Sequence, residues 1–316
     1  MMKYKIVCIF TFVLLLVGCT GERFQGINTH QSFVASMNIL EPSLTFYDRQ
    51  GELIANWAFE KAYTGAVLIQ QDRVLLYGHQ LTEADIYELS SGKKLATIET
   101  GIGTTNAYYA VDEQMIFLTN SRSNSLMRYN LYGEPDGELA LRNYPMSMIA
   151  HEGLLYVVNY KDTVLSVVSI EDLSLQAEWP IEKSSHGFAI VEDTLLIGGH
   201  GEGMHSNETV KVLDLASGKE LSTMTMPLMP IGFAQKEDEL AVISHGSNML
   251  YVTEPTGKPK WQLEVGANPF AVAYFNSHII VAGYDDNKIY FIQHGHIDET
   301  ISVDKGPFQL LVRGDS

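Results

Sequence analysis

The sequence predicts an all-β fold, a seven-bladed β-propeller whose first blade is completed by the C-terminal strand. Three observations predict this fold. From Gln31 onward, short apolar runs alternate with Gly, Asn, Asp and Ser turns, and no convincing helix is present. These runs repeat about every 41 residues. One strand is left over at the C-terminal end. We expect residues 32–316 to form the propeller.

The repeat is visible in two separate features. The first is an apolar strand that ends in small or polar residues and recurs about every 38 to 46 residues. Its copies begin at Phe33, Leu75, Phe117, Tyr156, Leu196, Val242 and Ile280. The second is one bulky apolar residue near the end of each unit, at Trp57, Ile98, Leu141, Trp179, Met224, Trp261 and Ile301. Both features give seven units, and a period of about 40–50 residues is typical of propeller blades.

Each unit is predicted to hold four strands, which the fourth unit shows clearly at 145–150, 154–159, 164–170 and 175–180. Short polar turns join the first two strands, and glycine turns such as Ser90-Ser91-Gly92 join the last two. The first unit begins with its second strand, at 32–37, and segment 306–312 matches the first strands that follow Pro230 and Pro269. The last strand is therefore expected to complete the first blade and close the ring.

The N-terminal end predicts export. Lys3 and Lys5 precede an apolar run of about 12 residues, which is too short to span a bilayer and has the length of a signal-peptide core. Residues 16–19, which read Leu-Val-Gly-Cys, resemble the bacterial lipobox. We expect a signal peptide over residues 1–18, acylation of Cys19, for example by palmitate, and a polar tether over residues 19–31. An ordinary secretory signal with an accidental cysteine is the alternative.

Composition narrows the possible partners. The only cysteines are Cys8 and Cys19, so the mature body has no disulfide and no thiolate metal site. The formal net charge of −17 disfavours binding of nucleic acid by broad charge attraction. We expect a protein held by its lipid on the extracytoplasmic face of the cell membrane or outer membrane.

A family resemblance follows from the repeat. Residues 156–159, which read Tyr-Val-Val-Asn, the following strand 164–168 and the prolines that begin first strands (Pro145, Pro230, Pro269 and Pro307) resemble the YVTN-type propeller repeats of bacterial envelope and surface-layer proteins. The resemblance covers about residues 32–313. It implies a propeller architecture of the surface-layer and quinoprotein-like kind, and no single chemistry.

Strand order predicts where a site would lie. The loops that lead into first strands and those that join second to third strands share one end of the ring, at the mouth of the central channel. The candidate ligand-binding residues on this end are His79, Arg122, Tyr160, His186, Glu202 and Tyr284. Candidate metal ligands there are His186, His200, His205 and His245, with glycines that allow the loop 199–208 to bend.

Three interpretations of the histidines stay open. They are surface residues without a role, ligands for zinc or copper, or a general base that works with Glu202 in a propeller lyase or lactonase. The spacing matches no specific metal motif, and no nucleophile elbow, phosphate loop or dinucleotide fingerprint is present. The sequence thus favours a binding or scaffolding module for an envelope protein, peptide or small ligand over an enzyme.

Overall fold

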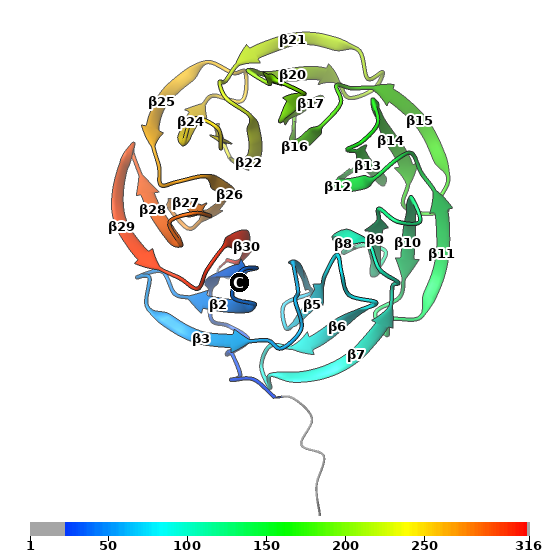
Figure 1. The fold of residues 1–316 in the computed structure, drawn as a ribbon, viewed down its shortest axis with the longest axis vertical. Helices are drawn as coiled ribbons and strands as arrows, with labels where there is room; N and C mark the ends of the chain where they lie inside the picture. The colour runs from blue at the N-terminus through cyan, green and yellow to red at the C-terminus, as the bar shows by residue number, and fades with distance from the viewer. Residues whose placement is uncertain (1–22, 315–316) are drawn as a thin grey trace, which may run out of the picture.

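The computed structural model describes residues 23–314, and the predicted signal peptide and Cys19 lie outside them. The described residues form seven four-stranded antiparallel sheets arranged as blades around a central axis (Figure 1). The predicted seven-bladed all-β propeller is confirmed. Within residues 23–314, no helix is long and apolar enough to cross a membrane.

The strands of each blade follow one another outward from the channel. Blade 1 holds β30 (Pro307–Arg313), β1 (Phe33–Asn38), β2 (Ser43–Tyr47) and β3 (Leu53–Ala58). Blade 2 holds β4 (Gly65–Ile69), β5 (Arg73–Tyr77), β6 (Glu83–Glu88) and β7 (Lys93–Glu99). Blade 3 holds β8 (Thr104–Ala110), β9 (Met115–Asn120), β10 (Ser125–Tyr129) and β11 (Pro135–Ala140). Blade 4 holds β12 (Pro145–His151), β13 (Leu154–Asn159), β14 (Val164–Ser169) and β15 (Leu175–Pro180).

The remaining blades follow the same order, with one insertion. Blade 5 holds β16 (Ser185–Val191), β17 (Thr194–Gly199), β20 (Thr209–Asp214) and β21 (Glu220–Thr225), and its second and third strands are separated by a small hairpin of β18 (Gly201–Glu202) and β19 (His205–Ser206). Blade 6 holds β22 (Pro230–Lys236), β23 (Glu239–Ser244), β24 (Met249–Thr253) and β25 (Pro259–Glu264). Blade 7 holds β26 (Pro269–Phe275), β27 (His278–Gly283), β28 (Lys288–Gln293) and β29 (His296–Ser302).

The ring closes through the C-terminal strand, as predicted. β30 pairs antiparallel with β1, and Val312 lies opposite Val34 (Figure 1). Each innermost strand also contacts the innermost strand of the next blade around the whole ring. The two ends of the chain thus share one sheet, which leaves no unpaired edge at the seam.

The cores lie between neighbouring blades, because the middle strands of each sheet are covered on both faces. Between blades 2 and 3, for example, the fully buried side chains of Leu75, Ile86, Ile116 and Leu118 pack together. Continuous apolar runs in the second strands supply these contacts, and burial of each such side chain stabilises the fold by about 1.5–3 kcal/mol.

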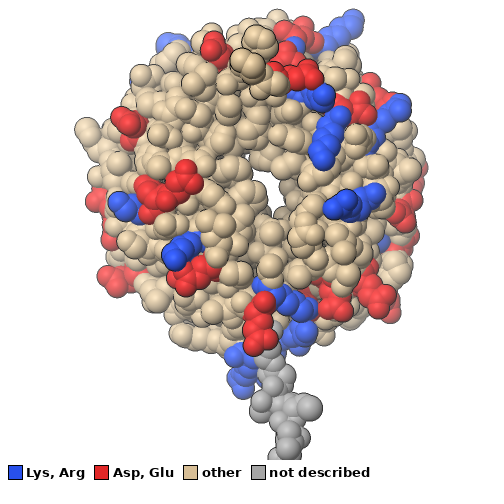
Figure 2. Space-filling view, viewed as in Figure 1, with Lys and Arg blue, Asp and Glu red and all other residues tan. Residues whose placement is uncertain are grey.

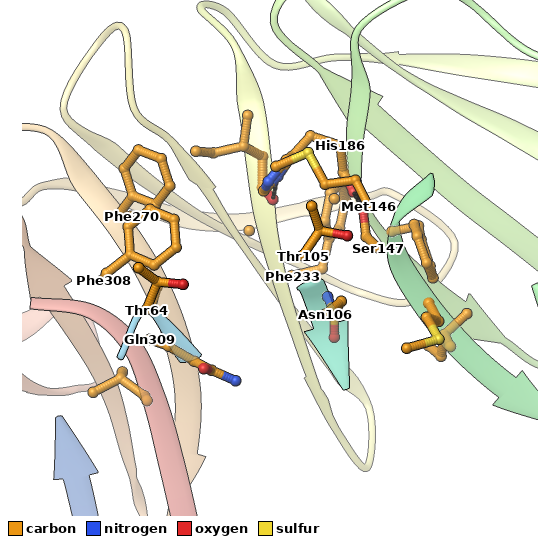
Figure 3. Close-up of a pocket in the computed structure, with 18 of the residues that line it drawn as sticks. Thr64, Thr105, Asn106, Met146, Ser147, His186, Phe233, Phe270, Phe308 and Gln309 are labelled. Atoms are coloured by element: carbon orange, nitrogen blue, oxygen red, sulfur yellow. Dashed lines mark hydrogen bonds between the residues drawn. The ribbon is translucent and has the colours of Figure 1, made fainter. Parts of the chain in front are cut away.

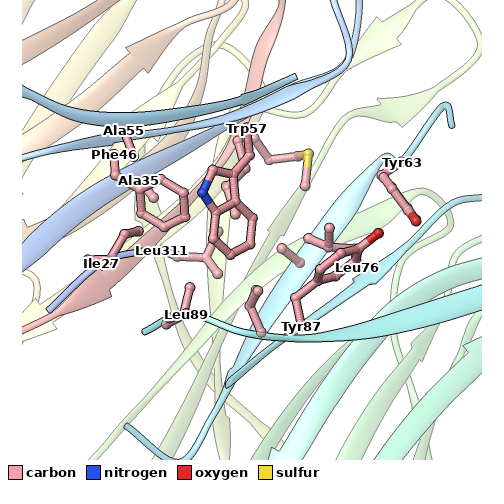
Figure 4. Packing of buried hydrophobic residues seen from close by; sticks show 14 of the residues in the cluster. Ile27, Ala35, Phe46, Ala55, Trp57, Tyr63, Leu76, Tyr87, Leu89 and Leu311 are labelled. Carbon is pink, nitrogen blue, oxygen red and sulfur yellow. The ribbon is translucent and has the colours of Figure 1, made fainter. Parts of the chain in front are cut away.

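The segment expected to be a polar tether lies against the propeller from Arg23 onward. We call residues 23–31 the N-terminal strap. The Phe24 ring stacks on Trp57 with centroids 4.9 Å apart, and the Trp57 indole Nε1 donates a hydrogen bond to the Gln25 carbonyl. Ile27 is buried and donates its backbone N–H to the Leu89 carbonyl, beside the core shown in Figure 4. Two apolar side chains therefore attach the strap to blades 1 and 2.

Candidate functional site

The seven innermost strands enclose a cavity of about 540 Å³ in the channel. Figure 3 shows Phe270, Phe308 and Phe233 around it, together with hydroxyl and amide groups such as those of Thr105 and Gln309. Among the residues that the structure describes, those lining the cavity include no Asp, Glu, Lys or Arg. Figure 2 shows the opening at the centre of the ring, surrounded mostly by uncharged residues on the face in view. An uncharged, largely apolar lining is typical of small-molecule sites.

A repeated β-bulge directs side chains into this cavity. In six of the seven blades, the pairing of the innermost strand with its neighbour shifts register directly after the first residue of the strand. The residues in this position all line the cavity, and they are Thr105, Met146, His186, Ile231, Phe270 and Phe308. Because a bulge leaves one residue unpaired and bends its strand, it re-aims that side chain. One side chain from each of these blades thus faces the channel.

Rings form a continuous arc around the channel mouth, and we call it the aromatic arc. It consists of His79, Tyr144, Tyr160, His186, His200, His245, Phe270, Tyr284 and Phe308. Ring centroids along it are 6.2 Å apart for His79 and Tyr144, and 6.1 Å apart for Tyr144 and Tyr160. At the far end the Phe270 and Phe308 rings stack at 4.6 Å. The arc draws on blades 2, 4, 5, 6, 7 and 1, so segments distant in sequence share it.

Three histidines lie at the centre of the arc. The His200 ring centroid is 5.5 Å from that of His186 and 5.2 Å from that of His245. Asn268 Oδ1 lies 2.5 Å from His245 Nδ1 and fixes the orientation of that ring, whereas the buried His200 Nδ1 has no hydrogen-bond partner. Burial, with smaller contributions from His186 and His245, lowers the pKa of the His200 imidazole to about 4. His200 is therefore neutral near pH 7, and among the described residues its buried Nδ1 is left without a hydrogen-bond partner.

A second group of residues at the mouth surrounds His79. Its Nε2 lies 3.1 Å from Ser121 Oγ and 3.5 Å from the Tyr144 hydroxyl. Burial lowers the pKa of His79, and the nearby charges of Arg122 and Lys161 lower it further. The Lys161 Nζ itself lies 4.1 Å from the centre of the Tyr144 ring.

The structure brings together most of the residues singled out from the sequence, but not all. His186, His200 and His245 meet, and Tyr160 and Tyr284 join the same arc. His205 does not join this cluster, because the hairpin β18–β19 places it opposite Glu202 in an exposed position. Within residues 23–314, no three His, Cys, Asp or Glu side chains are arranged to hold a metal ion. Zinc or copper binding stays a prediction.

Glu202 lies opposite His205 in the hairpin, and among the described residues it makes no contact with His186, His200 or His245. The Glu202 carboxylate accepts a hydrogen bond from Lys183 Nζ at 2.9 Å and is exposed. Met204, at the tip of the same hairpin, is 98% exposed. The loop 199–208 pairs with itself in this hairpin, which leaves Met204 and His205 exposed.

Sequence reasoning missed Phe270 and Phe308 as site residues. Both directly follow a proline at the start of an innermost strand, which the sequence shows at Pro269 and Pro307. The sequence does not reveal the β-bulge that turns these side chains toward the channel. In a regular strand the side chains would alternate between the two faces of the sheet.

No protein-family model matches the chain, and no curated protein matches it. Solved structures are similar to it in fold. A functionally unknown protein from Desulfotomaculum acetoxidans has a TM-score of 0.76 and 8% identity, with 90% of this chain and 100% of that chain covered. Dihydro-heme d1 dehydrogenase NirN, in complex with DHE, has a TM-score of 0.68 and 14% identity, with 90% and 66% covered. Virginiamycin B lyase from Staphylococcus aureus has a TM-score of 0.63 and 16% identity, with 76% and 84% covered. At these identities the similarity shows the fold alone.

Proposed function

We propose that this chain is a lipid-anchored envelope protein whose propeller binds a small, ring-bearing ligand at the mouth of its channel. The observation that carries this proposal is the aromatic arc above an uncharged cavity of about 540 Å³. Aromatic rings offer large apolar faces at fixed angles, and neutral imidazoles add hydrogen bonds without the cost of burying a charge. Of the ligand classes expected from the sequence, a small molecule fits a cavity of this size, lined by residues of all seven blades, better than a protein or peptide.

The proposed anchor would also orient the propeller. Only residues 20–22 separate Cys19 from Arg23, where the strap begins to lie against blades 1 and 2. A fully extended chain covers about 3.5 Å per residue, so lipid on Cys19 would lie within about 14 Å of Arg23. The edge of the ring at blades 1 and 2 would therefore face the membrane. The Tyr-Val-Val-Asn strand and the prolines at strand starts support membership of the YVTN-type repeat proteins, which is likewise a proposal.

We favour binding over the lyase or lactonase alternative because of the position of the Glu202 carboxylate. General acid–base catalysis needs its groups within hydrogen-bond reach of the reacting atoms. Glu202 lies in the exposed hairpin and is paired with Lys183, and the low pKa of His200 makes it a weak base near pH 7. The neighbours in fold include a dehydrogenase and a lyase, but at 14% and 16% identity they show the fold alone and do not decide between binding and catalysis.

The proposal can be tested with an uncharged aromatic probe. A soluble form that begins at Thr20 keeps every described residue, and it is titrated with N-phenyl-1-naphthylamine, whose fluorescence rises on transfer to an apolar site. We expect saturable binding, and Tyr160→Ala should weaken it about fivefold, since loss of one aromatic contact is worth about 0.5–1.5 kcal/mol.

The matched control is Tyr132→Ala. Tyr132 is 78% exposed in the turn between β10 and β11, away from the lining of the cavity, so its removal should leave the titration unchanged. Absence of saturable binding, or an equal loss in both variants, would refute a ligand site at the mouth.

A further inference from the structure

The mouth of the channel carries an unbalanced positive charge on one side. Arg122 lies in the loop between β9 and β10, and Lys161 lies in the loop between β13 and β14. Within residues 23–314, neither side chain forms an ion pair, although the whole chain has a formal net charge of −17. Lys183, on the same end of the ring, is by contrast neutralised by Glu202. Two unpaired cations at one place in an acidic protein need a physical explanation.

Both cations act on the same spot. The Arg122 side chain packs over Gly103, where a Cβ would lie 2.6 Å from Arg122 Cγ, and the Gly103 N–H donates to the His79 carbonyl. Lys161 approaches the same point from blade 4 across the face of the Tyr144 ring, at 4.1 Å. Each of the two charges is close enough to His79 to lower the pKa of its imidazole. A single ligand group beside His79 would therefore feel both.

The site beside these cations offers a further hydrogen-bond donor. The Tyr144 hydroxyl lies 3.5 Å from His79 Nε2 and can turn toward a bound group, whereas the buried Ser121 hydroxyl donates to the Gly103 carbonyl. The cavity below includes no carboxylate among its described lining residues. Glu202 is paired with Lys183 on blade 5, and the Asp162 carboxylate, which follows Lys161 in its loop, accepts the Thr163 N–H and forms no ion pair with Lys161 among the described residues.

We propose that the ligand is an aromatic acid, whose carboxylate binds between Arg122 and Lys161 while its ring enters the aromatic arc. This inference rests on the proposed function and names the class of ligand for that site. Arg122 offers a planar fork of donors that matches a carboxylate, and Lys161 adds a mobile point charge. Rings alone would also attract a cationic ligand through their faces, but Arg122 and Lys161 repel one from this side of the mouth.

The test compares two probes that differ by one anionic group. N-phenyl-1-naphthylamine is uncharged, and 8-anilino-1-naphthalenesulfonate carries a sulfonate on the same ring system. In the double variant Arg122→Gln/Lys161→Gln, we expect affinity for the sulfonate probe to fall tenfold or more, which is about 1.4 kcal/mol, while affinity for the uncharged probe changes less than twofold. Raising the salt concentration from 20 to 300 mM should weaken only the sulfonate probe in the wild type.

Arg142→Gln is the matched control, because Arg142 precedes β12 on the same end of the ring but is paired with Glu178 at 2.7 Å. It should leave both titrations unchanged. A double variant that binds the sulfonate probe within twofold of wild type would overturn the inference, and so would equal weakening of both probes. In either case saturable binding of the uncharged probe would leave the proposed function standing, whereas failure of both probes to bind the wild type would remove both.

Discussion

The Arg313 side chain should be one of the strongest single contributors to ring closure. It lies at the end of β30 and is only 5% exposed. Its guanidinium donates to three backbone carbonyls, those of Asn28, Gln31 and Gln71, at distances of 2.5 to 3.0 Å. It also lies over the Phe33 ring, 4.5 Å from its centre. One side chain therefore joins the C-terminal strand to the N-terminal strap and to the first hairpin of blade 2.

The size of the effect follows from these contacts. A hydrogen bond that involves a charged group contributes about 1.5–3 kcal/mol, and a buried carbonyl left without its donor costs about 1–3 kcal/mol. These values do not add fully, and single substitutions above about 4–5 kcal/mol are exceptional. Arg313→Met keeps the apolar stem over Phe33 but removes every donor. We expect it to lower the free energy of unfolding by about 3–4 kcal/mol.

The assay is urea unfolding of the soluble form, followed by the fluorescence of its three tryptophans, of which Trp57 is fully buried. Arg313→Lys should recover only part of the loss, because one ammonium cannot reproduce the fork that reaches three separate carbonyls. Arg142→Met, at an exposed ion pair, should leave the midpoint nearly unchanged. A loss below about 1 kcal/mol in Arg313→Met would show that the pairing of β30 with β1 closes the ring without this side chain.

Three further outcomes are expected. Deletion of residues 306–316 removes β30 and exposes an edge of β1, so the protein should aggregate and lose cooperative unfolding; an unchanged melting temperature would contradict this closure. Because the pKa of His200 is lowered from its ordinary value of 6.5 to about 4, the unfolded chain takes up a proton in this range that the folded protein does not, so stability should fall as pH decreases from 6.5 to 4. His200→Gln should reduce that slope in urea midpoints measured at several pH values, and an equal slope would assign it to other groups. Cys19→Ala should abolish incorporation of labelled fatty acid and release the protein from membranes, and a correctly cleaved variant that stays bound would refute the lipid anchor.

The blades could be predicted because their signals are local and repeated. Apolar second strands, glycine turns and a bulky residue on each fourth strand all recur with the same period. The second strands and the bulky residues each give seven units. The first blade lacked one strand, so the strand left over at 306–312 could be placed beside β1. Trp57 illustrates the limit of this reasoning. Its position on a fourth strand was predicted, but not the Phe24 ring that covers it, since one aromatic residue in a polar segment carries no periodic signal.

The candidate site could be predicted in place but not in detail. Strand order alone puts His79, His200 and His245 on one end of the ring, and the structure shows their rings in one arc. The inward direction of Phe270 depends on a register shift of one residue, which no residue type in the sequence announces. The failure at His205 has the same origin, because whether a long loop folds over a site or pairs with itself is decided by tertiary contacts.

The bulges explain how a repetitive fold can carry a specific site. Six of the seven blades present an equivalent position to the channel, so the identity of the residue there can change without disturbing the sheet behind it. Blade 5 places His186 in this position, and blades 7 and 1 place Phe270 and Phe308 there, which makes one side of the channel rich in rings. The bulge positions of blades 3 and 4 hold Thr105 and Met146, and the loops of these blades supply Arg122 and Lys161, which form no ion pair among the described residues. A ligand that bound only to the repeated positions could enter in several equivalent orientations, whereas these two cations favour one, with the anionic end of the ligand toward blades 3 and 4.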